Sequence, residues 1–281
     1  MPKIQNITTD PDFTVTKQPL YNRDGEVLKG HFGTFREGVK EPLGIVAERY
    51  KVVNYMDILN PVEEALDGLG MTDYDKRVRI VGNGERMYTS YTFKNRVAKV
   101  KSVGDEVGFR LTAVGSHDRT NRLKFLMGLL RLVCTNGMVT LKPEFSMSRL
   151  HSNRLNIGFV QDAIRNAVAG FEKSTAMLDV LAKQQVTQAA GRIIIGNLDL
   201  TKPIAEGVTK VWNDPTYQDD SERNLYNLYN AATEHLTQEV EEKRYEYAQG
   251  RNRSVLTSLL KASRDDNAFA ALLKEPKPEN N

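Results

Sequence analysis

The chain has 281 residues, of which 40% are hydrophobic and 27% charged, and its net charge at pH 7 is +3. This composition is typical of a globular protein with a buried core and excludes a largely disordered chain. No apolar stretch approaches the roughly 18 residues of a membrane-spanning helix, and the N-terminus lacks the apolar segment of a secretory signal. The single cysteine excludes an internal disulfide framework. We therefore expect a soluble cytoplasmic protein that does not associate with membranes.

Charge is distributed unevenly along the chain. Residues 87–154 contain twelve Lys or Arg against four Asp or Glu, which leaves a net charge of +8. Residues 212–249 contain three basic and nine acidic residues, a net charge of −6. A basic centre favours a surface that faces a polyanion, with the acidic C-terminal part as an appendage. Ordinary solvated surface charge explains the same counts equally well.

The first 50 or so residues have the pattern of short strands and turns. Phe13–Thr16 alternates, and Asn22–Gly25 is a turn in which glycine supplies a positive φ. His31–Arg36 is a second candidate strand, and Tyr50–Asn54 predicts a third. A helix should follow, because apolar residues then recur at helical spacing at Ile58, Val62, Ala65 and Leu66.

The ends of that helix are indicated by capping residues. Asn54 or Asp57 is a candidate for its N-cap, because a short polar side chain can accept hydrogen bonds from the first N–H groups. Gly68-Leu69-Gly70 then ends the helix.

Period-two alternation from Arg77 to Val114 predicts an antiparallel meander of at least three strands. Val78 and Ile80 alternate with arginines, and Gly82-Asn83-Gly84 is a hairpin turn. Gly104-Asp105 marks the next turn.

The apolar run from Leu123 to Cys134 fits both a helix and a buried strand. The Asn136-Gly137 turn signal favours a strand, with Met138–Leu141 as the returning strand of a hairpin.

The chain after about residue 150 is helical by pattern. Apolar residues repeat at helical spacing from Ile157 to Leu181 and predict one long helix. Shorter helices are predicted at 187–195, 203–212 and 225–236, and the last within 255–273. The polar segment 213–221 should be a linker.

These patterns predict an α+β fold, with an antiparallel β-meander in the N-terminal half, a long helix and a helical C-terminal part. The expected organisation is a β-rich domain over 1–155, a long helix with its extension over 156–212, a helical region over 213–273, and a disordered tail over 274–281.

No catalytic constellation stands out in the sequence. Gly82-Asn83-Gly84 lacks the Gly-Lys-Ser/Thr ending of a phosphate-binding loop. The four histidines are far apart, and His117-Asp118 is only half of a metal-binding pair. Cys134 at the end of an apolar run is more often a small buried hydrophobe than a nucleophile activated by His117 or His151. We therefore predict no metal site, no cofactor and no enzymatic activity.

Basic residues form the strongest functional signal. Two lie near a strand end and turn, three lie in the loop before the central apolar run, and two flank the entry to the long helix, whose N–H groups favour anions. The predicted nucleic-acid contacts are Lys99, Lys101, Arg119, Arg122, Lys124, Arg149 and Arg154.

Aromatic residues of the meander offer stacking faces for unpaired bases. Tyr88, Tyr91 and Phe93 lie within one predicted strand. Tyr91 and Phe93 have the same parity and should share a face, for which the core is the better interpretation.

The stretch Arg131-Leu-Val-Cys-Thr-Asn-Gly-Met138, with Gly115–Asp118 upstream, resembles the phage- and plasmid-borne proteins that carry domain of unknown function 932 (DUF932). Tyr50–Asn54 before a helix and Leu225–His235 late in the chain fit that family. The resemblance spans roughly residues 40 to 240. It implies a mobile-element protein in a bacterial host cell, and it brings no established site residues.

A meander followed by one long helix also resembles the plan of Rad52-like single-strand annealing proteins, which form oligomeric rings that hold single-stranded DNA in a basic groove. By this analogy we expect a homo-oligomer that binds single-stranded DNA or RNA as a recombination or annealing accessory. The alternative is a protein-interaction factor that modulates host or defence proteins through its acidic helical part. An enzyme built on Cys134, His117 and Asp118 is the third hypothesis.

Overall fold

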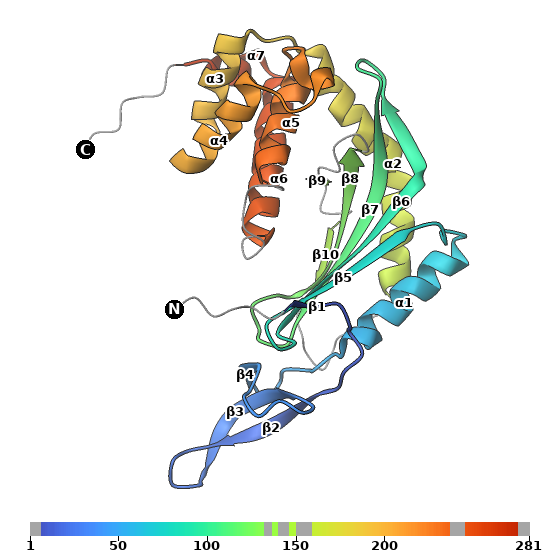
Figure 1. Cartoon of the computed structure of the whole chain (residues 1–281), viewed down its shortest axis with the longest axis vertical. Helices are drawn as coiled ribbons and strands as arrows, with labels where there is room; N and C mark the ends of the chain where they lie inside the picture. The colour runs from blue at the N-terminus through green and yellow to red at the C-terminus, as the bar shows by residue number, and fades with distance from the viewer. Residues whose placement is uncertain (1–6, 132–136, 140–145, 150–158, 237–244, 275–281) are drawn as a thin grey trace, which may run out of the picture. The chain divides into compact units, whose positions relative to one another are not determined.

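A computed structural model describes residues 7–131, 137–139, 146–149, 159–236 and 245–274 (Figure 1). Strands occupy the N-terminal half and helices most of the C-terminal half, which confirms the predicted α+β class. The main sheet has the strand order β1-β5-β6-β7-β8-β10, with β9 paired to β8, and a second sheet has the order β2-β3-β4.

The strands precede most of the helices in the chain, and helix α1 lies between β4 and β5. The strands are β1 (Ile7–Thr8), β2 (Val15–Tyr21), β3 (Val27–Arg36), β4 (Gly44–Ala47), β5 (Asp75–Val81), β6 (Arg86–Val100), β7 (Asp105–Ser116), β8 (Leu123–Arg131), β9 (Gly137–Val139) and β10 (Ser146–Arg149). The helices are α1 (Tyr55–Gly68), α2 (Phe159–Lys183), α3 (Gln188–Asn197), α4 (Lys202–Asn213), the 3-10 helix η2 (Gln218–Ser221), α5 (Leu225–Glu234), α6 (Tyr245–Ala262) and α7 (Asp266–Leu272).

The chain divides into two compact units that are each made of several segments. Unit 1 comprises Met1–Phe93, Arg110–Met127 and Lys142–Ala169, and unit 2 comprises the rest, Lys94–Phe109, Gly128–Leu141 and Gly170–Asn281. Strands β6, β7 and β8 and helix α2 therefore contribute residues to both units.

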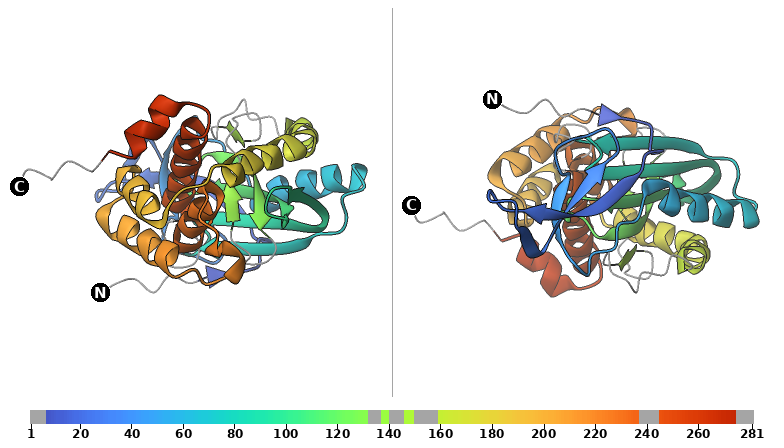
Figure 2. Two further views of the ribbon diagram at one scale, coloured as in Figure 1. Left: turned by 90° about the horizontal axis from the view of Figure 1, so that it is seen from above. Right: turned by 90° about the horizontal axis from the view of Figure 1, so that it is seen from below.

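In unit 1, helix α1 packs on one face of the main sheet, as the views of Figure 2 show. Its apolar stripe is fully buried, as the spacing of Ile58, Val62 and Leu66 predicted. The sheet residues under it include Tyr91, whose hydroxyl donates to Glu63 Oε1 of α1 at 2.9 Å, and Phe93, which is 1% exposed. This burial confirms that Tyr91 and Phe93 are core residues.

The segment before α1 differs from its prediction. Residues 50–54 form no strand, although Tyr50 and Val53 are buried. The Tyr50 hydroxyl donates to the Ser116 carbonyl at 2.8 Å, so a side chain and not a backbone ladder anchors this extended connection. Asn54 occupies the N-cap position, but its side chain accepts from the Val15 N–H at 2.8 Å and does not cap the helix.

The small sheet of unit 1 is joined to the main sheet's loop after β7. The Thr34 hydroxyl donates to the His117 carbonyl at 2.8 Å. Gly44, in the unpredicted strand β4, approaches Asp118 so closely that a Cβ would lie 2.5 Å from its Cα. Glycine at this position therefore allows the loop and the strand to touch.

The ambiguous apolar run is a strand for Leu123–Arg131, which confirms the favoured interpretation. Gly128 pairs with Val139 and Leu130 with Gly137, so β9 returns antiparallel as predicted from the Asn-Gly signal. Cys134 lies outside the described residues.

Unit 2 is built around the C-terminal helices. Its core contains Trp212, Tyr226, Tyr229 and many aliphatic side chains, and the strand residues Val100 and Val107 belong to it. The sequence predicted the last helix within 255–273, whereas the structure has two helices, α6 and α7. Asp265 separates them, because its side chain accepts from the N–H groups of Asn267 and Ala268 and so begins a new helix.

Candidate nucleic-acid interface

The two faces of the main sheet in unit 1 differ in chemistry because side chains alternate along each strand. Strands β5 and β6 pair antiparallel with Arg77 opposite Ser90 and Arg79 opposite Tyr88. Residues directly opposite each other share a face. Tyr91, opposite Lys76, has the other parity and lies on the face that α1 covers. Arg77, Arg79 and Tyr88 therefore lie on the face away from α1.

Strand β7 adds a further arginine to that face. A Cβ on Gly115 would lie 3.1 Å from Ile58 Cδ1, so odd-numbered residues of β7 face α1. Arg110 has the opposite parity, and its Nη2 donates to the Ser90 hydroxyl at 3.4 Å. We call this surface the basic face and define it by the following side chains. They are Arg77, Arg79, Arg86, Tyr88, Ser90, Arg110 and Lys124.

Lys124 of β8 reaches the same surface through a short polar chain. Its Nζ lies 3.5 Å from Asn121 Oδ1, and Asn121 Nδ2 donates to the Tyr88 hydroxyl at 3.3 Å. Lys124 and Tyr88 are both partly exposed, whereas Asn121 is 4% exposed. The Asn121 side chain therefore connects the Lys124 ammonium group to the Tyr88 hydroxyl.

The basic face carries much more positive than negative charge. Among the described residues of β5 to β8 on this side of unit 1, Asp75 is the one carboxylate. Arg86 is partly neutralised from the loops, with its Nε 3.5 Å from Asp118 Oδ2. Burial lowers the pKa of Arg79 from its ordinary value, against the opposing influence of Tyr88. A partly desolvated guanidinium gains more from an approaching anion than a fully hydrated one.

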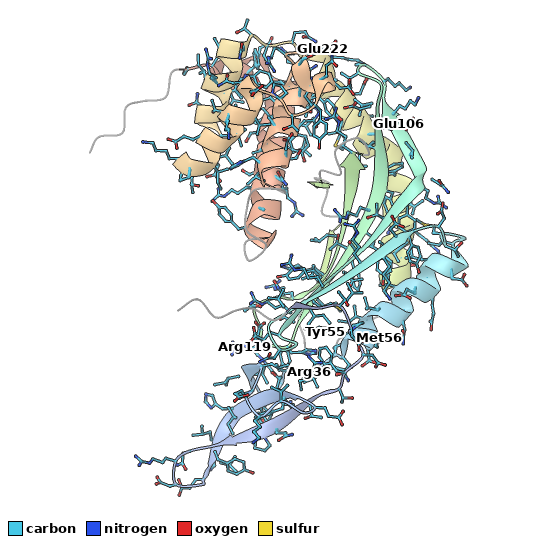
Figure 3. The ribbon with its side chains drawn as sticks, in the orientation of Figure 1. Arg36, Tyr55, Met56, Glu106, Arg119 and Glu222 are labelled. Atoms are coloured by element: carbon cyan, nitrogen blue, oxygen red, sulfur yellow. The ribbon has the colours of Figure 1, made fainter. Side chains whose placement is uncertain are left out.

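Three of the predicted contacts lie together in the loop after β7 and the start of β8. Arg119 is exposed beside strand β4 (Figure 3), and its Nη1 donates to the Ile45 carbonyl at 3.2 Å. Its backbone has φ +68°, an uncommon conformation for a residue with a Cβ. Arg122 is exposed, and Lys124 belongs to the basic face.

The backbone of one further predicted contact, Arg149, lies beside these three, and the remaining predicted contacts fall in unit 2 or outside the described residues. Lys99 and Lys101 belong to unit 2, where both are exposed and Lys99 Nζ lies 3.4 Å from Glu106 Oε1. The backbone of Arg149 pairs with Leu123 of β8 in unit 1. Arg154 lies outside the described residues.

The sequence reasoning missed Arg77, Arg79 and Arg110 as site residues. The signal was present, because Arg77 and Arg79 alternate with Val78 and Ile80 along one strand. Such alternation indicates one apolar and one basic face, although both arginines precede the basic stretch of residues 87–154.

A pocket of unit 1 lies on the small sheet. This pocket of about 620 Å³ is lined by residues that include Thr16, Gln18, Phe35 and Arg36. The Arg36 guanidinium already lies 3.9 Å from the centre of the Phe13 ring and donates to the Asn83 carbonyl. The basic face offers more cations, so we treat it as the candidate site.

The side chains of His117 and Asp118 each contact a neighbouring residue. His117 is buried, with its ring centre 4.4 Å from that of Tyr55, while Asp118 contacts Arg86. Within the described residues no three His, Cys, Asp or Glu side chains are grouped as metal ligands. None of the helices in the described part of the chain is both long enough and apolar enough to cross a membrane.

Fold and surface together define an α+β protein with a basic sheet face. A sequence profile described as Domain of unknown function (DUF932) matches residues 42–260. The match covers most of the chain, and the protein belongs to the DUF932 family, as its motifs predicted. Comparisons with curated proteins and with solved structures gave no match, so the analogy with Rad52-like annealing proteins gains no support from them.

Proposed function

We propose that this protein binds single-stranded nucleic acid through the basic face. The observation that supports the proposal is the gathering of Arg77, Arg79, Arg110 and Lys124 around Tyr88 on the sheet face opposite α1. Cations of this kind neutralise phosphates, and an aromatic ring beside them offers a surface for a base. The exposed Arg119 and Arg122 extend the positive surface along the neighbouring loop.

Phosphate contacts predict a characteristic dependence on salt. Each phosphate that a cation neutralises releases a counterion, and log K falls with log[salt] by about 0.7 per contact for single strands. Four contacts on the basic face would therefore give a slope of about −2.8. A protein without a phosphate surface has affinity for DNA near zero at every salt concentration.

The test is a titration of labelled oligo(dT) with the full chain across a salt series. The variant Arg77→Glu/Arg110→Glu/Lys124→Glu should lose most of the affinity and flatten the salt slope. A matched control makes the same charge change on the exposed Arg192, Lys202 and Lys210 of α3 and α4, and it should bind as the unchanged protein does. Equal loss in both variants, or undiminished binding in the first, would refute the basic face as the binding surface.

The cellular role that we propose is that of a recombination or annealing accessory encoded by a phage or plasmid and acting in the host cytoplasm. Such a role is commonly performed by self-associating proteins, so a mass measurement with and without oligo(dT) belongs to the same experiment. A single mass equal to that of one chain under both conditions would count against self-association.

A further inference from the structure

We infer that Tyr88 is the base-stacking platform of the basic face, and that an unpaired strand crosses the sheet along the row Arg79, Tyr88 and Lys124. This inference rests on the proposed nucleic-acid binding and goes further, because it names the residue that selects unpaired bases over a duplex. The inference is based on the position of the Tyr88 ring between the side chains of Arg79 and Lys124.

The ring is held in place before any ligand arrives. The Tyr88 hydroxyl accepts from Asn121 Nδ2 at 3.3 Å. Asn121 is itself fixed, because its N–H donates to the Ser116 hydroxyl at 3.0 Å and its carbonyl accepts from that hydroxyl at 3.0 Å. A tethered ring loses little conformational freedom on binding, so most of the stacking energy is available to the complex.

Cations stand on both sides of this ring along one direction across the strands. Arg79 is the register partner of Tyr88 on β5. On the other side, Asn121 connects Tyr88 to Lys124 of β8. Neighbouring strands are about 4.8 Å apart, so β5 and β8 are separated by roughly 14 Å. A strand of nucleic acid laid across the sheet would meet a phosphate contact, a base platform and a second phosphate contact in succession.

The other aromatic residues of these strands are not available for stacking. Tyr91, Phe93, Phe109 and Phe125 are each at most 3% exposed. Within the described residues of β5 to β8, Tyr88 is thus the aromatic side chain that is placed on the basic face and partly exposed.

The platform gives a reason for preferring unpaired bases. In a duplex both faces of each internal base are covered by neighbouring base pairs, so the ring of Tyr88 gains nothing from them. In a single strand one base can stack on the ring while its phosphates contact Arg79 and Lys124. The cations alone would bind either form of nucleic acid, and the ring would add affinity for the unpaired form only.

The experiment compares Tyr88→Leu and Tyr88→Phe in the full chain. Affinities are measured for oligo(dT) and for a duplex of the same length, and the fluorescence of 2-aminopurine in a single strand reports stacking. Tyr88→Leu should weaken oligo(dT) binding by about 5- to 160-fold, the range of one base-aromatic stack, with the salt slope and the duplex affinity unchanged. Tyr88→Phe keeps the ring but removes the hydroxyl that accepts from Asn121, so it should retain the quenching of 2-aminopurine and lose less oligo(dT) affinity than Tyr88→Leu.

Tyr21→Leu is the matched control, because Tyr21 is a 59% exposed tyrosine on the small sheet, away from the basic face. It should leave all three measurements unchanged. An unaltered ratio of single-strand to duplex affinity in Tyr88→Leu would overturn the platform while leaving nucleic-acid binding intact. If the unchanged protein binds neither ligand at low salt, the proposed function itself fails.

Discussion

Arg131 and Asp220 are 89 residues apart in the chain, yet they form an ion pair of 2.7 Å inside unit 2. The Arg131 side chain is 0% exposed, and its Nε also lies 2.7 Å from Asp105 Oδ2. Asn230 Nδ2 donates to Asp220 at 3.0 Å. This one guanidinium joins the beginning of β7, the end of β8 and the helical region at η2. Burial alone would lower the pKa of Arg131, but the carboxylates of Asp220 and Asp105 raise it above its ordinary value.

We predict that Arg131→Met destabilises the protein by about 3–5 kcal/mol, because it leaves two buried carboxylates without their cation. Chemical denaturation measures the free energy of unfolding. Adding Asp105→Asn and Asp220→Asn to the same chain should recover part of the loss. Lys183→Met, which removes an ion pair with Asp179 in which the lysine is 67% exposed, should change stability by less than about 1 kcal/mol. If Arg131→Met and Lys183→Met lowered the free energy of unfolding by similar amounts, burial of the ion pair would not explain the stability.

A second prediction concerns the response to acid. Lys183 and the Ser102 N–H hydrogen-bond the carboxylate of Asp179 and lower its pKa from the ordinary value of 3.8. A group whose pKa is depressed in the folded state stabilises that state above the unfolded pKa and loses this effect as pH falls through the folded pKa. Asp179→Asn should therefore be less stable than the unchanged protein at pH 7, and the difference should shrink as pH falls below about 3.8 and vanish below the depressed folded pKa of Asp179. Thermal unfolding across pH tests this, and a difference that is constant with pH would argue against it.

A third prediction compares two helical glycines of unit 2. A Cβ on Gly191 would lie 2.4 Å from Trp212 Cε2, whereas a Cβ on Gly250 would meet nothing within 4 Å. Gly191→Ala should therefore destabilise by about 1–3 kcal/mol through overpacking against the buried indole. Gly250→Ala, in α6, should be neutral or stabilising by up to about 1 kcal/mol, because alanine favours the helix. Equal effects of the two substitutions on the melting temperature would contradict the contact with Trp212.

A fourth prediction tests the left-handed backbone of the loop after β7. Arg119 has φ +68°, which disfavours any residue with a Cβ by about 1–2 kcal/mol. Arg119→Gly and Arg119→Ala both remove the guanidinium and its bond to the Ile45 carbonyl. The glycine variant should nevertheless be the more stable of the two by about 1 kcal/mol in chemical denaturation. An alanine variant as stable as the glycine variant would show that the loop relaxes to another conformation.

Much of the fold could be predicted in segments where the spacing of apolar residues matches the side of the strand or helix that is buried. The alternation from Arg77 to Val114 predicted the meander, and the helical spacing after Ile157 predicted α2. Residues 50–54 show the limit of this reasoning, since a buried extended connection and a strand have the same local pattern. The four-residue strand β4 is too short to leave a periodic signal.

The candidate site was predicted less well because surface and interior charges look alike in a sequence. Arg131 counted toward the basic centre, yet it is completely buried by partners that are distant in the chain. Arg77 and Arg79, by contrast, precede the basic stretch of residues 87–154 and contribute to the basic face. Only the register of β5 against β6 places them beside Tyr88.

The alternation of the two units along the chain also determines the order in which they can be completed during translation. Unit 1 has all its segments once residue 169 has been synthesised, whereas the strand segments of unit 2 appear long before its helices. The helix residues that pack against Val100 and Val107 are therefore synthesised more than 60 residues later in the chain. During this interval we expect the nascent chain to present apolar strand ends, a state that chaperones recognise and that slow translation would prolong.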